Sequence, residues 1–147
     1  MNTKLCLWFY LALTWSFSGW AKTFDEHLAA MARERAMEVA TAFSDEAFTM
    51  RDSYWSGQLV EGEQRIFGVS LFAGNEYWFC LGAAPEDARW VIDVFDERGQ
   101  PLAAQERAEG SSKAAVRVVP ESGGTHFVRI FLWKGEPSHF CVLYSYK

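Results

Sequence analysis

From residue 57 to residue 146 the sequence is a series of short runs in which apolar and polar residues alternate, divided by clusters of turn-forming residues. Alternation with a period of two is typical of strands that bury one face. No stretch of helical periodicity separates the runs, which favours antiparallel pairing. The pattern predicts a mainly β domain over residues 56–147, an antiparallel sandwich or barrel of about eight strands. The expected strands are 57–60, 65–72, 76–81, 89–96, 101–105, 113–119, 125–133 and 138–146.

An amphipathic helical segment is expected ahead of the strands, over residues 22–55. Good helix formers (Ala, Met, Glu and Arg) dominate residues 28–41. Thr23 and Glu26 have the spacing of a capping box, which places a helix start at Thr23. Apolar side chains at helical spacing predict one buried face. They are Leu28, Ala32, Val39, Phe43 and Met50, flanked by Phe24 and Met31.

Residues 1–21 are typical of a secretory signal peptide. Lys4 supplies a short basic start, and residues 5–18 form an apolar stretch that is too short to cross a bilayer as a helix. Gly19 and Ala21 place small residues three and one before a cleavage site, so the mature chain would begin near Lys22. The sequence therefore predicts export, to the periplasm or out of the cell. An uncleaved signal anchor is the alternative.

The remaining chain is acidic and has the size of one domain. Removing 21 residues from 147 leaves 126, enough for a single core. Removing Lys4 leaves 13 basic side chains against 19 acidic ones, a net charge of −6. A chain of this charge has no electrostatic reason to bind nucleic acid or anionic lipid. We expect no nucleic-acid partner and no membrane contact after signal cleavage.

Two cysteines remain once the signal is removed, Cys80 and Cys141. An even count in an oxidising compartment favours one intramolecular disulfide. A bridge between them would close a loop of about 60 residues and add about 4 kcal/mol in the chain-entropy description. Two buried free thiols are the alternative.

Residues 57–147 resemble the bacterial pre-peptidase C-terminal (PPC) domain. The resemblance rests on strand and turn spacing: Tyr-Trp-Phe-Cys-Leu at 77–81, Val-Ile-Asp-Val-Phe-Asp at 91–96 with Gly99 following, and the turn at 120–128 leading into Val-Arg-Ile. The family implies a small jelly-roll-like β-sandwich that serves as a non-catalytic appendage of secreted hydrolases. No peptidase precedes the domain here, so the resemblance implies a stand-alone relative.

A register similar to that of the family divides the strand side chains between a core and two outer faces. Cys80 and Cys141 both point outward, as a bridge across one face requires. The residues expected to point inward are Phe67, Val69, Leu71, Tyr77, Phe79, Leu81, Trp90, Ile92, Val94, Val128, Ile130, Phe140, Val142 and Tyr144.

The same register places four aromatic side chains on outer faces, and they form the candidate binding surface. Monomers seldom leave so large an aromatic patch in water. The helix over residues 24–50 is therefore expected to cover part of it. The four residues are Trp78, Phe127, Phe131 and Trp133.

No convergent catalytic or metal-binding set is visible in the sequence. His27, His126 and His139 lack zinc-ligand spacing, and there is no Gly-x-Ser-x-Gly elbow. Asp93 and Asp96 offer oxygen ligands that calcium would accept, but a hairpin turn at 96–99 also explains Asp96. We therefore expect no enzyme activity, no catalytic residue, no metal and no other cofactor. A small secreted hydrolase ranks third, after a binding or accessory module and a carbohydrate-binding module. It would need a pocket that joins His126 or His139 to a carboxylate.

The surplus of outward aromatic side chains favours a binding role. The sequence predicts a non-enzymatic exported protein that acts as a binding or accessory module, with another envelope protein as its partner. A carbohydrate-binding module that stacks polysaccharide on the same aromatic side chains is the alternative function.

Overall fold

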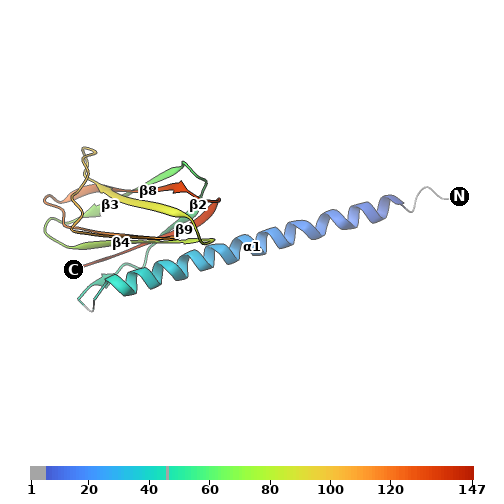
Figure 1. Ribbon diagram of the computed structural model, residues 1–147, viewed down its shortest axis with the longest axis horizontal. Helices are drawn as coiled ribbons and strands as arrows, with labels where there is room; N and C mark the ends of the chain where they lie inside the picture. The colour runs from blue at the N-terminus through green and yellow to red at the C-terminus, as the bar shows by residue number, and fades with distance from the viewer. Residues whose placement is uncertain (1–5, 46) are drawn as a thin grey trace.

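The computed structural model describes residues 6–45 and 47–147, with side chains from residue 21 onward, and arranges them in three layers (Figure 1). A three-stranded sheet packs on a six-stranded sheet, and a long helix, α1 (Cys6–Phe43), lies on the far side of the six-stranded sheet. The strands in chain order are β1 (Thr49–Met50), β2 (Trp55–Leu59), β3 (Gln64–Leu71), β4 (Tyr77–Ala84), β5 (Arg89–Phe95), β6 (Glu106–Gly110), β7 (Lys113–Val118), β8 (Gly124–Lys134) and β9 (Ser138–Tyr146).

Every strand pair in the described chain is antiparallel, which confirms the predicted sandwich. The six-stranded sheet has the order β1-β9-β4-β7-β6, and β2 also pairs with β9. The three-stranded sheet has the order β3-β8-β5. Within the six-stranded sheet, β9 pairs with β1, β2 and β4, so the last strand joins β1 and β2 to the rest of the sheet.

The core lies between the two sheets, and the predicted inward residues all belong to it. Trp90, Phe79 and Phe140 are the largest side chains that are fully buried there. The rings of Trp90 and Phe140 meet edge to face, with 5.9 Å between their centroids. The alternation along each strand therefore determines which of its side chains are buried in the core.

One predicted strand is wrong. Residues 101–105 form a connection in which only Pro101 bridges to Phe95, and the strand that follows is β6. Proline cannot donate a ladder hydrogen bond. β6 is an edge strand that carries charged residues on both faces, Glu106 on one and Arg107 and Glu109 on the other, so the apolar Ala108 does not produce a regular alternation in its sequence.

Helix α1 packs on β4, β9 and β7 through a seam of small and apolar side chains. The predicted face is confirmed at Leu28, Ala32, Val39 and Phe43, which all join this seam. Phe24 does not: its side chain is 65% exposed. The seam also includes Met31, Ala36, Ala40, Phe48, Met50, Trp78, Cys80, Ala84, Ala108, Ala115, Cys141 and Leu143.

The helix is longer than predicted at its N-terminal end and shorter at its C-terminal end. It is continuous from Cys6, so Thr23 lies within it rather than at its start, and it projects beyond the sandwich (Figure 1). It ends at Phe43, and the next residues turn into β1. Residues 1–5 of the predicted signal peptide lie outside the described residues, and the cleavage itself stays a prediction. Among the residues described, no helix is both long enough and apolar enough to span a bilayer.

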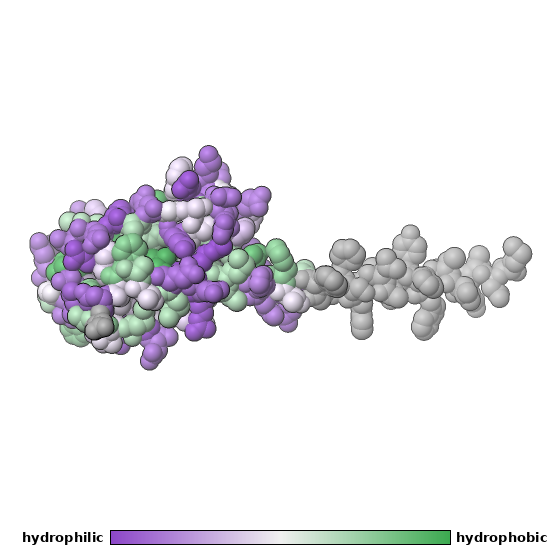
Figure 2. Space-filling model, turned by 60° about the horizontal axis from the view of Figure 1, so that its bottom comes forward, coloured by the Kyte–Doolittle hydropathy of each residue, from purple (hydrophilic) through white to green (hydrophobic). Residues whose placement is uncertain are grey.

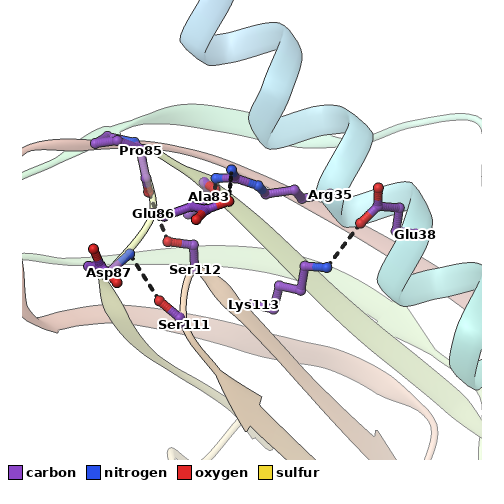
Figure 3. Close-up of polar contacts among 9 residues, drawn as sticks. All are labelled: Arg35, Glu38, Ala83, Pro85, Glu86, Asp87, Ser111, Ser112 and Lys113. Atoms are coloured by element: carbon purple, nitrogen blue, oxygen red, sulfur yellow. Dashed lines mark hydrogen bonds and ion pairs between the residues drawn. The ribbon is translucent and has the colours of Figure 1, made fainter.

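Charged side chains fasten α1 to the loops at one end of the six-stranded sheet (Figure 3). The Arg35 guanidinium donates to the Ala83 carbonyl at 2.6 Å and to Glu86 at 2.8 Å. One turn further along, Lys113 donates to Glu38 at 2.9 Å. On this side of the molecule hydrophilic and hydrophobic residues are interspersed (Figure 2).

The two loops that receive α1 are also joined to each other. The Asp87 amide donates to Ser111 Oγ at 2.9 Å, and Ser112 Oγ donates to the Pro85 carbonyl at 2.8 Å (Figure 3). Asp87 and Ser112 have positive φ angles of 72° and 56°, in the left-handed region that costs non-glycine residues free energy. The reciprocal hydrogen bonds hold both residues there.

Candidate binding surface

The structure divides the four predicted surface aromatics between two sheets. Trp78 lies on β4, beneath α1, with 3% of its surface exposed, and its ring stacks on Phe43 at 4.9 Å between centroids. The helix therefore covers Trp78, as predicted for part of the patch, and removes it from any accessible surface. Phe127, Phe131 and Trp133 lie on β8, in the other sheet.

The predicted disulfide is not formed, because Cys80 and Cys141 are both free thiols in the structure. They do share one face of neighbouring strands, in the seam under α1. However, Cys80 is paired with Leu143 and Cys141 with Gly82, so the two cysteines are diagonal neighbours. Diagonal Cα atoms are about 7–8 Å apart, whereas a disulfide closes without backbone movement only below roughly 7 Å.

Burial makes both thiols poor nucleophiles. It raises the pKa of Cys80 to about 12, and it raises the pKa of Cys141 to about 11, with the nearby Arg33 charge opposing the second shift. The thiolate is the reactive form of cysteine. Cys80 and Cys141 therefore act as packing residues.

The three-stranded sheet lies on the side of the sandwich away from α1 (Figure 1). Its outward side chains form a second aromatic surface. Along β8, Phe127 is opposite Phe95, and Phe131 is opposite Val91. We name this surface the outer aromatic face; it comprises Ile66, Val91, Asp93, Phe95, Phe127, Arg129, Phe131 and Trp133. Ile66 is 54% exposed and Trp133 is 49% exposed, while the rings between them are half-buried.

A charged cluster occupies the middle of the outer aromatic face. Arg129 pairs with Asp93 at 2.6 Å, and Arg107 reaches the other oxygen of the same carboxylate at 2.8 Å. The Arg129 guanidinium lies over the Phe95 ring at 5.2 Å. Its Nε is buried and has no hydrogen-bond partner in the described part of the chain. The face thus combines aromatic side chains with a partly unsatisfied arginine.

These contacts bear on the calcium alternative. Both oxygens of Asp93 are bound by arginines, and Asp96 Oδ1 accepts the amides of Arg98 and Gln100, as a hairpin turn requires. Within residues 6–45 and 47–147 no group of three His, Cys, Asp or Glu side chains is placed to hold a metal ion.

Sequence reasoning missed the charged cluster of the outer aromatic face. The signal was present, because alternation along Val-Arg-Ile at 128–130 already points Arg129 outward between Phe127 and Phe131. Asp93 has the same parity on β5. Their pairing depends on the β5–β8 register, which sets Asp93 opposite Arg129 and which the sequence does not state.

Comparison with known proteins gives no family. No protein family matches the chain, and no curated protein matches its sequence. PliG of Aeromonas hydrophila, a periplasmic inhibitor of g-type lysozyme, is similar in structure with a TM-score of 0.48 and 14% identity, over 65% of this chain and 85% of PliG. The CspB protease of Clostridium perfringens is similar with a TM-score of 0.40 and 9% identity, over 60% of this chain and 25% of the protease chain. The resemblance to the PPC domain stays a prediction.

Proposed function

We propose that this protein is an exported, non-enzymatic binding module that docks on another envelope protein through the outer aromatic face. The observation that carries the proposal is the contrast between its two sheets. The six-stranded sheet has its outer face covered by α1, whereas the three-stranded sheet leaves Ile66, Phe131 and Trp133 in contact with water.

The composition of the face supports a protein partner. Protein interfaces are enriched in aromatic residues and arginine, and their strongest contacts are central and become fully dry on binding. Here the half-buried rings of Phe127 and Phe131 flank the Arg129–Asp93 pair. A partner that brings a hydrogen-bond acceptor to the centre would satisfy the remaining donors of Arg129 while it buries both rings.

The non-enzymatic part of the proposal rests on how the polar side chains of the face are used. Asp93 is held between Arg107 and Arg129, so its carboxylate is committed to ion pairs rather than to proton transfer. Both cysteines are buried with raised pKa values, so neither is an activated nucleophile. Export rests on the predicted signal peptide at residues 1–21.

The test is affinity capture of envelope proteins from the native host by the full-length chain. Three forms are compared: the parent, the pair Phe131→Ala/Trp133→Ala, and Met37→Ala as a matched control. Met37 is an exposed apolar side chain on α1, in the layer farthest from the outer aromatic face. We expect one or more envelope proteins to be retained by the parent and by Met37→Ala, and lost with the face variant.

The affinities of the parent and the face variant for the purified partner are then measured. Truncating a central aromatic anchor costs about 2 kcal/mol or more, which is roughly a 30-fold loss of affinity. A partner that binds the face variant as tightly as the parent would contradict the proposal, provided that both variants keep the unfolding midpoint of the parent.

Exposed Trp133 also favours the second candidate function, stacking on polysaccharide. An exposed indole ring offers the flat apolar surface on which a sugar ring can rest. A pull-down with insoluble peptidoglycan, chitin and cellulose distinguishes the two. Retention of the parent on one polymer, with loss in Trp133→Ala and no captured protein, would replace the protein-docking proposal with this one.

A further inference from the structure

We propose that a cavity at one end of the sandwich binds a small organic cation through a primary ammonium group. The cavity has a volume of about 340 Å³ and opens between the β5–β6 connection and the β7–β8 loop. None of the residues that define the outer aromatic face is among its lining residues. Its lining comprises Asp96, Pro101, Leu102, Ala103, Gln105, Val119, Glu121, Ser122 and His126.

His126 is the central group of this cavity. It lies at the start of β8 with an inward side chain, and only 3% of the residue is exposed. Its Nδ1 lies 3.0 Å from the Gly124 carbonyl. A carbonyl only accepts, so Nδ1 carries a proton, and in the neutral form of the ring Nε2 is then an acceptor. Nε2 has no hydrogen-bond partner in the part of the chain that the structure describes.

Two carboxylates line the cavity together with this imidazole, which is the combination that the hydrolase alternative requires, but no hydrogen bond joins His126 to either of them in the described chain. Asp96 directly follows β5. Its Oδ1 already accepts the Arg98 and Gln100 amides, which fixes the side chain and leaves Oδ2 for a ligand. Glu121 lines the cavity from the β7–β8 loop, on the exposed side. Neither lysine nor arginine is among the lining residues. The site is therefore rich in acceptors and negative in charge.

These properties define the chemistry of the ligand. A primary ammonium group has three donors and no acceptor, which matches three acceptor groups: His126 Nε2, Asp96 and Glu121. Charge-assisted hydrogen bonds to carboxylates are the strong ones. The apolar side chains of Leu102 and Val119 line the same cavity and suit a short alkyl chain. A volume near the lower end of ligand sites, about 300–1,000 Å³, limits the ligand to a small molecule.

The test is a titration of the full chain with 1,4-diaminobutane, followed by nuclear magnetic resonance of the His126 ring and the backbone amides of residues 121–126. The matched probe is 1,4-butanediol, which has the same length without charge. We expect saturable shifts in the millimolar range with the diamine and none with the diol. Equal binding of the diol, or no saturable shift with the diamine, would overturn the proposal.

Three variants test the assigned groups, and a fourth variant serves as the control. Glu121→Gln and Asp96→Asn remove one charge each, and the asparagine keeps the oxygen that closes the turn. His126→Asn keeps a donor for the Gly124 carbonyl and removes Nε2. Each is expected to weaken diamine binding about tenfold or more. Glu136→Gln, in the β8–β9 turn outside the cavity, should bind as the parent does.

One further outcome is decisive. Parent-like affinity in both Glu121→Gln and Asp96→Asn would refute the site, because the ammonium would then be held elsewhere. Glu121 is exposed, so its replacement tests the proposal even where His126→Asn perturbs folding. A thermal melt of each variant separates the two effects.

Discussion

Gly82 of β4 lies against the backbone of Ala36 in α1. A Cβ atom built on Gly82 would come within 2.2 Å of the Ala36 nitrogen and 2.5 Å of the Ala32 carbonyl oxygen. Helix and sheet therefore meet backbone to backbone at this point, and the small side chains of Ala32 and Ala36 allow the approach. Any larger residue at position 82 must lift the helix.

Gly82→Ala should therefore destabilise the protein, by about 2–3 kcal/mol or more, because overpacking against backbone atoms has no cheap relief. Gly68→Ala is the matched control, since Gly68 lies on an outer strand position with nothing within 4 Å of its added Cβ. Urea unfolding measures both. A Gly82→Ala variant as stable as Gly68→Ala would show that α1 is not seated on β4 as described.

The two tryptophans of the predicted binding surface should behave in opposite ways. Trp78→Ala removes a ring buried under α1 and should cost about 3–5 kcal/mol of folding free energy. Trp133→Ala removes a half-exposed ring and should change that free energy by about 0.5 kcal/mol or less. Denaturant melts of the two variants give the comparison. Similar losses in both would contradict the assignment of Trp78 to the seam.

The buried thiols predict how stability depends on alkaline pH. In the unfolded chain each cysteine titrates near 9.0, whereas in the fold the pKa of Cys80 is about 12 and that of Cys141 is about 11. Above pH 9.0 the unfolded state therefore binds fewer protons than the native state, and the free energy of unfolding falls as pH rises. Each thiol contributes a slope of up to about 1.4 kcal/mol per pH unit.

Comparing the reduced parent with the double variant Cys80→Ala/Cys141→Ala isolates this effect from other titrating groups. The parent should lose more stability between pH 9.0 and 11, and below pH 9.0 the difference between the two proteins should stay constant. Parallel pH profiles would refute the raised pKa values. Mass analysis of unfolded, alkylated protein should find Cys80 and Cys141 both modified, and a Cys80–Cys141 crosslink would contradict the described state.

A polar contact joins the N-terminal side of the α1 seam to β9. His139 Nε2 lies 2.6 Å from Asp25 Oδ1, and the imidazole is nearly buried while the carboxylate is mostly exposed. Asp25→Ala leaves that imidazole without its partner and should cost about 1–2 kcal/mol. The exposed neighbour Glu26→Ala is the control. A double-mutant cycle with His139→Ala should give a coupling energy well above zero, and additivity would show that the contact carries no stability.

The predictions from sequence succeeded where alternation was regular. Runs such as Phe67 to Leu71 and Val128 to Ile130 bury every second residue, so both the strand and its inward face could be predicted. They failed at β6, where Glu106, Arg107 and Glu109 make both faces polar. An edge strand pairs with only one neighbour and need not bury a full face, so its sequence need not alternate between apolar and polar residues.

The candidate site could be predicted only in part, for a different reason. Parity says that Trp78 and Phe127 both point outward, but it does not say which sheet each strand joins. That depends on pairing between distant segments, which placed β4 beside β9 and β8 beside β5. The cavity at the end of the sandwich could not be predicted for the same reason. Asp96, Glu121 and His126 come from two loops and one strand, and only the fold brings them together.

The position of β9 has a consequence for how the protein is made. This strand follows every other described element in chain order, yet β1, β2, β4 and α1 all rest on it. Until β9 has been synthesised, β1, β2 and β4 lack their common pairing partner, and α1 lacks part of the sheet surface on which it packs. We therefore expect the six-stranded sheet to assemble only after the residues of β9 are available.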